Sequence, residues 1–590
     1  MMNFQFTNLN LTIENFHNSQ WQEVINNSEK KDCFHYSKGF SKKLKETEQN
    51  NNVSPEHQIT LLLLSRITYP KLKPESLDQP FATDVIEQIP DEYFIFLQDW
   101  VSHINDYELK ARIADIIWIR KKNYRMAQLA IDNYLESAKS LEDPEHWTYS
   151  IDRIERAIRL AYQTNQKIQK QKVFEHIENV LQKYNGEDPL FLSAKLMEFL
   201  QEFKQGDPSI YAPLAEKLAK KAENKHNWSL ARNYWCIAIG WYKKDKNINC
   251  ERCASLNYAE TYIQEAEDKI NQSPPSYLVA SRFLAKAIEA LRNIGNNQKR
   301  EEEIHLKLLD YQQKSTRELG LFSQEINLSN IAIQAINRVK RKKFDEAIYV
   351  LALDSKSPSK QDIKQQTKDL MENSLFYLFP SISINEMGKV IGINPSLEDE
   401  MCKIAVYHQN AQVYGIIEPM RNQINLEHYV KVSDFYSFVV DNPFIPRGRE
   451  EIFARGLYSG LIGDFLVATH LLIPQIENSL RHVVKGMGKI TSFLDTDKGG
   501  IQDEHIMSVL FDENKHLKDL EILYGEDIVF DLVCLLNRKG FGSNLRNNMA
   551  HGLLDINHFY TSSAVYFWWI TLHLCCLHKI SKNQSTDKNT

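Results

Sequence analysis

Residues 230–244 read LARNYWCIAIGWYKK, and this stretch carries the pattern that decides the fold. Its apolar side chains return every three or four positions, which is the spacing of one face of an α-helix. Residues 111–123, ARIADIIWIRKKN, show the same spacing. A half-buried strand would instead alternate apolar and polar residues. Both stretches therefore predict amphipathic helices.

The pattern continues from about residue 56 to residue 380, with short polar breaks such as SLEDPEHW at 140–147. Parts of this region also resemble each other, because YLESA at 134–138 is similar to YIQEA at 262–266. Chance similarity among amphipathic helices is the alternative explanation. Repeated helix pairs with short polar connections are typical of an α-solenoid. We therefore expect a domain of TPR-like helical hairpins over 56–380.

The composition supports an all-α protein. The chain has 590 residues but contains 21 Gly and 18 Pro, which is few for a fold that needs many tight turns. Apolar residues make up 43% and charged residues 25%, the range of soluble globular domains. The net charge of −6 excludes a generally basic nucleic-acid binder. Any nucleic-acid binding must come from a local basic patch.

Changes in composition suggest further segments. Residues 1–55 are rich in Asn, Lys and Glu and are expected to be loosely ordered. Residues 381–446 contain more Gly and Pro and are expected to connect two domains. Residues 447–580 predict a bundle of four or five helices, in which Pro474 opens a new helix. Residues 581–590 are expected to form a disordered tail.

The cysteines and the N-terminus indicate a cytoplasmic protein. The eight cysteines are widely spaced, and no basic segment followed by an apolar one opens the chain, so we expect them to be reduced. The apolar run at 564–576 is shorter than the roughly 18 residues of a membrane span and predicts a buried helix. The single pair Cys250 and Cys253 lacks further ligands at zinc-site spacing, so we expect no metal and no cofactor.

The densest basic run is RVKRKK at 338–343. It could bind a phosphate backbone, or it could be a solvated helix end whose cations suit the helix dipole. The candidates for RNA binding are Arg338, Lys340, Arg341, Lys342 and Lys343.

An unusual group of polar residues lies in GSNLRNNMAHGLLD, residues 542–555. Asn547 and His551 are four apart and would share one helix face, whereas Arg546 and His551 are five apart and would not touch within one helix. They could line a groove together, especially across a two-fold axis. Asn548 and its neighbours could instead simply form a turn and cap a helix.

These residue types suit phosphodiester chemistry. Neutral His551 can take a proton from a ribose 2′-hydroxyl, and its cation can protonate a leaving oxygen near neutral pH. The Arg546 guanidinium can hold a phosphate and offset the charge that develops on it. Asn547 can orient the phosphate or the imidazole. No metal is required when the nucleophile belongs to the substrate.

The sequence Arg-Asn-x3-His resembles the Arg-x4-6-His motif of the HEPN superfamily (higher eukaryotes and prokaryotes nucleotide-binding). The earlier stretch PQIENSLR adds Glu477 and Arg481, similar to the Glu-x3-Lys/Arg of an earlier HEPN helix. The resemblance covers about residues 447–580 and is strongest over 466–555. This part of the sequence is similar to a HEPN branch of domains of unknown function that includes the ER membrane-associated RNA degradation protein.

This resemblance implies a metal-independent endoribonuclease that acts as a homodimer, cuts RNA and leaves a 2′,3′-cyclic phosphate. His551 would be the general acid or base, Arg546 the phosphate clamp and Asn547 an orienting residue. Glu477, Arg481 and Asn548 would support them. Many members are toxins or phage-defence effectors, whereas others only dimerise and bind RNA or nucleotide. We keep that binding module as the alternative, and we expect a protein partner for the helical repeats.

Overall fold

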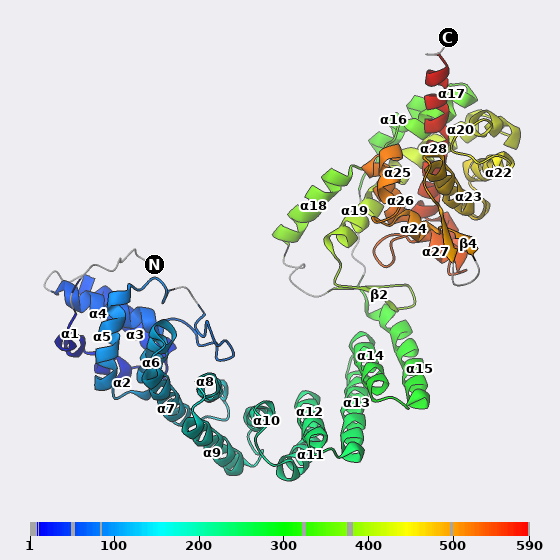
Figure 1. The fold of residues 1–590 in the computed structure, drawn as a ribbon. Helices are drawn as coiled ribbons and strands as arrows, with labels where there is room; N and C mark the ends of the chain where they lie inside the picture. The colour runs from blue at the N-terminus through cyan, green and yellow to red at the C-terminus, as the bar shows by residue number, and fades with distance from the viewer. Residues whose placement is uncertain are drawn as a thin grey trace. The chain divides into compact units, whose positions relative to one another are not determined.

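The computed structural model describes residue 9 and residues 11–48, 53–82, 85–320, 326–374, 381–495 and 500–587. The chain divides into two compact units, Met1–Tyr311 and Gln312–Thr590. Nearly all regular structure is helical (Figure 1). Within the described residues the strands form two short antiparallel hairpins, β1–β2 and β3–β4.

The first unit is a succession of helices. Consecutive helices such as α6 and α7, or α13 and α14, make its most extensive contacts, so each packs mainly on its neighbours in the chain (Figure 1). Nearest-neighbour packing of this kind defines a helical-repeat fold. The predicted all-α, helical-repeat fold is therefore confirmed. The helices are α1 (Ile13–Asn18), α2 (Trp21–Asn26), α3 (Cys33–Glu48), α4 (Pro55–Thr68), α5 (Asp91–Trp100), η1 (Val101–His103), α6 (Tyr107–Lys121), α7 (Tyr124–Ser140), α8 (Thr148–Gln163), α9 (Lys167–Tyr184), α10 (Leu192–Glu202), α11 (Pro208–Asn224), α12 (Trp228–Lys244), α13 (Ile248–Ile270), α14 (Tyr277–Ile294) and α15 (Gln298–Ser315).

In segment 1–55, which the sequence predicts to be loosely ordered, the described residues form α1–α3 and contribute to the core of the first unit. The Phe16 ring lies between the rings of Trp21 and Trp100, with centroid distances of 5.2 and 4.8 Å. Helix α3 buries residues at helical spacing, namely Cys33, Tyr36, Phe40 and Leu44. The prediction of loose order rested on the polar average composition of this segment. A few aromatic and aliphatic residues at helical spacing are enough to bury one face of its helices.

Two buried ion pairs join α6 to α8 in the first unit. The Glu108 carboxylate binds the Arg153 guanidinium at 2.6 Å, and Asp115 binds Arg156 at 2.8 Å. Arg156 and Asp115 are both fully buried. Buried charges are tolerated only when they are paired and hydrogen-bonded, so these pairs restrict how the two helices can pack.

The second unit surrounds a central helix with shorter ones. Its elements, some of which are labelled in Figure 1, are η2 (Thr316–Glu318), α16 (Ser329–Val339), α17 (Phe344–Leu353), α18 (Lys360–Asn373), β1 (Ile382–Ile384), β2 (Val390–Ile393), α19 (Leu397–Gln412), the π-helical η4 (Val413–Ile417), α20 (Glu418–Glu427), η5 (Val432–Phe435), α21 (Tyr436–Val439), α22 (Glu450–Leu461), α23 (Phe465–Gly486), β3 (Ser492–Asp495), β4 (Ile501–Glu504), α24 (Met507–Leu510), α25 (Leu517–Tyr524), α26 (Glu526–Leu536), α27 (Leu545–Ala550), η6 (Ile556–Tyr560) and α28 (Ser562–Asp587).

The central helix is α28, which contacts α17, α19, α22 and α23. Trp568 and Trp569 are fully buried, and their indole N–H groups donate to the carbonyls of Leu457 and Leu351, both at 2.9 Å. Buried tryptophan is stable when its polar atom finds such a partner. The run 564–576 is therefore a core helix, as the sequence predicts. Among the described residues, no helix has the length and apolarity needed to cross a bilayer.

The division between the units differs from the predicted domain boundaries at 380 and 446. Helix α17, predicted to belong to the repeats, accepts hydrogen bonds from α28 through the carbonyls of Leu351 and Ala352. Segment 381–446, predicted to be a connector, buries Ile417 and Met420 in the same core. The bulky aromatic residues of α28 must be covered on every side, and residues 447–580 alone do not do so.

Two helices also extend beyond their predicted limits. Helix α23 runs through Pro474, where the sequence predicts a new helix. The lost hydrogen bond is offset by buried neighbours such as Leu472 and Ile476. Helix α28 continues to Asp587, into the predicted disordered tail 581–590, and residues 588–590 lie outside the described part. No Gly or Pro stands in this stretch to end the helix.

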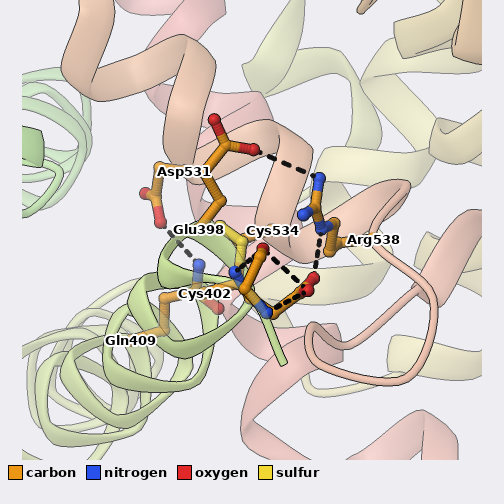
Figure 2. The surroundings of a disulfide bond; sticks show 8 residues. Glu398, Cys402, Gln409, Asp531, Cys534 and Arg538 are labelled. Carbon is orange, nitrogen blue, oxygen red and sulfur yellow. Dashed lines mark hydrogen bonds and ion pairs between the residues drawn. A yellow bond between two sulfur atoms is a disulfide. The ribbon is translucent and has the colours of Figure 1, made fainter. Parts of the chain in front are cut away.

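A disulfide joins Cys402 of α19 to Cys534 of α26 (Figure 2). Both residues are buried, and their Cα atoms lie 5.2 Å apart. The expectation that all eight cysteines are reduced is therefore wrong for this pair. The two are separated by 132 residues, so their spacing in the sequence carries no sign of the bond. The six other cysteines are free thiols.

Candidate functional site

Helix α27 is positioned by the loop 538–544, which turns back onto the end of α26. The Ser543 N–H donates to the carbonyl of Cys534 at 3.0 Å. Gly542 lies against the same carbonyl, so closely that a Cβ atom has no room there. Asn544 adopts a left-handed conformation with φ of 47°, which asparagine tolerates, just before α27 starts. These constraints direct the first turn of α27 towards α23.

Two arginines share one carboxylate at this point. Arg546 of α27 binds Glu477 of α23 with Nε–Oε2 and Nη2–Oε1 distances of 3.0 and 3.4 Å. Arg481, one helical turn after Glu477, binds Oε1 at 3.2 Å. The Met507 N–H also donates to Oε1, at 3.1 Å. The tertiary structure thus gathers three predicted site residues, Arg546, Glu477 and Arg481, into one cluster.

The asparagines extend this cluster along α27. The Asn547 side-chain carbonyl accepts from Arg546 Nη1 at 2.8 Å, and its amide donates to Asn544 at 2.7 Å. Asn544 in turn donates to Asn548 at 3.2 Å. Asn547 therefore orients the guanidinium in this structure, whereas Asn548 helps to hold the loop that precedes the helix. Asn544 belongs to the same network and is not among the residues that sequence reasoning selected.

His551 lies apart from the cluster. It caps the C-terminus of α27, and its backbone N–H donates to the Asn547 carbonyl at 3.0 Å. The side chain is exposed, and within the described part of the chain it makes no hydrogen bond or ion pair. Arg546 faces inward and His551 faces solvent, so a single chain does not bring these two residues together. The sequence predicts the same, because residues five apart, such as Arg546 and His551, do not touch within one helix.

A pair of buried histidines adjoins the cluster and was missed by sequence reasoning. His505 Nδ1 and His516 Nε2 lie 3.0 Å apart, and His516 Nδ1 is 3.4 Å from Asp519 Oδ2. The His505 carbonyl accepts from Arg481 Nη1 at 2.9 Å. Burial lowers the pKa of His505, and so do the neighbouring cations. The hydrogen bond from Lys489 holds the pKa of Asp519 below its usual range. No motif spacing links these residues, so the sequence offered no signal.

The basic run 338–343 lies elsewhere in the second unit, at the turn between α16 and α17. Arg338 forms an ion pair with Asp354, and Lys342 forms one with Glu346. Lys343 lines a cavity of about 510 Å³. Two of the five candidate side chains are thus engaged in ion pairs within this unit, which is the arrangement expected of a solvated helix end.

Arg546 can bind an anion in two ways. It can bind the anion and Glu477 together, or it can leave Glu477 and bind the anion alone. Guanidinium carries five N–H donors, and the Arg546 side chain is 22% exposed, so it retains capacity to bind a phosphate oxygen. Across the described residues, no group of three or more His, Cys, Asp or Glu side chains is placed to hold a metal ion. The residues present here are suited to charge stabilisation and proton transfer.

Comparison with known proteins concerns the other end of the chain. Residues 6–173 match a domain of unknown function (DUF7380). This match spans α1–α8 and the start of α9, and it does not include α27. No curated protein and no solved structure matches the chain.

Proposed function

We propose that the protein is a metal-independent endoribonuclease of HEPN type. His551 moves a proton, Arg546 binds the scissile phosphate and Asn547 orients the guanidinium. Glu477, Arg481 and Asn548 hold this arrangement. The observation that carries the proposal is the hydrogen-bonded cluster of Arg546, Asn547 and Glu477, which joins two motifs 69 residues apart. This is the association that the HEPN resemblance predicts for these motifs.

The reaction needs no external nucleophile. A neutral imidazole removes the proton of the ribose 2′-hydroxyl, and the 2′-oxygen attacks the adjacent phosphorus. The bond to the 5′-oxygen breaks, and that oxygen takes a proton from an imidazolium. The products are a 2′,3′-cyclic phosphate and a 5′-hydroxyl. Arg546 offsets the negative charge that develops on the phosphate oxygens during this step.

A second copy of the chain would complete the site. One protomer has a single His551, which is exposed at the C-terminal end of α27, whereas the reaction uses both a base and an acid. In a two-fold dimer each site would combine side chains of both protomers. We therefore propose a homodimer formed through the second unit, with RNA as substrate. We further propose that the protein is cytoplasmic and acts as a regulated toxin or phage-defence effector.

The alternative is a dimerising module that binds RNA or nucleotide without cutting it. The observation that favours it is the engagement of Arg546, whose guanidinium already binds Glu477 and Asn547. A purely structural arginine would be bound in the same way. In either case we propose that the helical repeats of the first unit bind a protein partner, which would restrain or recruit the second unit.

The test is cleavage of tRNA and total RNA by the purified full-length protein in EDTA. We expect products with cyclic-phosphate ends, and a loss of roughly 10²-fold or more in rate for His551→Ala. His482→Ala replaces another exposed histidine of the same unit and serves as the matched control. A dimer that binds RNA but leaves it intact would favour the binding module. Equal cleavage by both variants would contradict the role of His551.

A further inference from the structure

A chain of hydrogen bonds leads from Lys489 to the buried histidine pair. Lys489 Nζ lies 3.0 Å from Asp519 Oδ1, Asp519 Oδ2 lies 3.4 Å from His516 Nδ1, and His516 Nε2 lies 3.0 Å from His505 Nδ1. Asp519, His516 and His505 are 8%, 6% and 5% exposed. The two imidazoles therefore exchange protons with each other more directly than with water.

Asp519 determines the direction of these hydrogen bonds. A carboxylate only accepts, so His516 Nδ1 carries the hydrogen that faces Asp519. In neutral His516 the other nitrogen, Nε2, accepts from the Nδ1–H of His505. One extra proton can enter, because His516 can become an imidazolium while His505 shifts its own hydrogen to Nε2. A second extra proton would set two N–H groups against each other and break the bond between the rings.

The main chain beside His505 is bound by residues of the candidate site. The His505 carbonyl accepts from Arg481 at 2.9 Å, and the Met507 N–H donates to Glu477 at 3.1 Å. Glu477 is also the partner of Arg546. A displacement of the His505 ring would therefore move a carbonyl and an amide that orient Arg481 and Glu477.

Charged groups on several elements surround the pair. They are Arg481 of α23 and Lys489 after it, Glu504 of β4, and Lys515 and Asp519 beside and within α25. The Phe493 ring of β3 covers His505, with a centroid distance of 4.3 Å. Asp519 and Glu504 favour the first extra proton, whereas the cations and the covering ring disfavour the second.

We propose that His505 and His516 are positioning residues that keep the Glu477–Arg481 pair in place for Arg546 as long as they share at most one extra proton. In acid, the second extra proton separates the rings and displaces segment 505–507. Arg546 then loses the orientation given by Glu477. This proposal rests on the proposed function, because it assigns a pH-dependent regulation to the same site.

The first test is the pH dependence of RNA cleavage by the full-length protein. On the acid side, every variant loses the general base of the proposed reaction, which contributes a slope of about 1. Log kcat/KM of the wild type should fall with a slope approaching about 2, and that of His516→Gln with a slope of about 1, because glutamine takes up no proton. His482→Ala should keep the steeper slope. Equal slopes in wild type and His516→Gln would overturn the proposal.

The second test does not require activity. In full-length protein with labelled histidine rings, the NMR signals of the pair are those lost in His505→Gln and in His516→Gln. We expect two titration steps more than about one pH unit apart, as for coupled groups. The Arg546 side-chain Nε–H signal is identified by its loss in Arg546→Lys. Its chemical shift should change in the titration step at lower pH, where the second extra proton enters.

These outcomes separate the two proposals. If no RNA is cut at any pH but the rings titrate in two steps and Arg546 responds, the positioning role stands and the ribonuclease proposal fails. If each ring titrates alone at an ordinary histidine pKa, or if Arg546 does not respond, the positioning role is wrong whether or not RNA is cut.

Discussion

At the scale of single residues, Glu477 determines the arrangement of the candidate site. It receives hydrogen bonds from Arg546, Arg481 and the Met507 amide, which come from three separate parts of the second unit. Its side chain is 12% exposed, so water compensates little for a lost partner. Without its charge, two guanidinium groups would face each other with nothing to separate their charges.

Glu477→Gln should therefore destabilise the second unit by about 3–5 kcal/mol, the cost of breaking a largely buried ion pair. Urea unfolding followed by tryptophan fluorescence measures this change. Glu451→Gln is the matched control, because Glu451 binds Arg455 at an exposed site and should show no measurable change. An equal effect of the two substitutions would mean that the Glu477 cluster contributes nothing specific.

Asp531 gives a second prediction, this time about pH. It is fully buried beside the disulfide and accepts from Tyr566 at 2.6 Å and from Gln409 at 2.5 Å (Figure 2 shows Gln409). Burial raises the pKa of Asp531 to about 6, despite the hydrogen bonds that lower it. Since this pKa is higher in the folded than in the unfolded chain, the stabilising contribution is complete below the unfolded value of about 4 and is lost as pH rises through 6.

Asp531→Asn should consequently raise the free energy of unfolding at pH 7.5 by about 1–3 kcal/mol and have little effect near pH 4, where Asp531 is neutral. Chemical unfolding at both pH values tests this. A loss of stability at pH 7.5 as large as at pH 4 would show that the ionised carboxylate is tolerated in the core.

At the scale of elements, the interface of α19 and α26 supports the candidate site. Arg538 pairs with Glu398 at 3.6 Å on one side of the disulfide, and Gln409 binds Asp531 on the other (Figure 2). The carbonyl of Cys534 holds Ser543, in the loop that leads into α27. The packing of these two helices therefore determines where α27 begins and where Arg546 lies.

Breaking the disulfide should destabilise the second unit by about 2–5 kcal/mol, because the bond closes a long loop in the unfolded chain. The comparison is Cys402→Ala/Cys534→Ala against Cys236→Ala, which removes an exposed free thiol. Thiol titration in denaturant should give six reactive groups without reductant and eight after reduction. Eight groups without reductant would show that the bond is absent in solution.

The spacing of apolar residues along the chain was enough to predict individual helices. The apolar period of 111–123 and 230–244 correctly predicts that these stretches form the helices α6 and α12. Helix α12 buries mainly one face, whereas α6 buries every residue from Ala111 to Trp118 and is therefore not amphipathic. The same period gives no warning that Asp115 is fully buried and paired with Arg156. Spacing along one helix identifies a face, but the partner that makes a buried charge tolerable comes from another helix.

At the scale of the whole molecule, the hydrophobic cores follow the division into two units. Among the described residues, the core clusters lie either between Leu11 and Tyr311 or between Ala335 and Cys576. Each unit thus buries its own apolar surface, which is the main source of its stability. A chain built in this way is expected to unfold in more than one step.

Calorimetry of the full-length protein should therefore show two transitions. Gly460→Ala places a Cβ against the Trp568 indole in the core of the second unit and should lower one transition only, by about 1–3 kcal/mol of overpacking. Gly486→Ala is the control, because open space surrounds that glycine. A single transition that shifts as a whole in Gly460→Ala would mean that the two units unfold as one.

The all-α class, most of the helices and the core helix at 564–576 could be predicted from the sequence alone. These follow from local period and composition, which act within a few turns of chain. Long-range packing sets the extent of each unit, the helices of the N-terminal segment, the bond between Cys402 and Cys534, the cluster of Arg546 with Glu477, and the histidine pair beside Arg481. All of these depend on residues far apart in the sequence that come together once apolar surfaces are buried, so no local pattern records them.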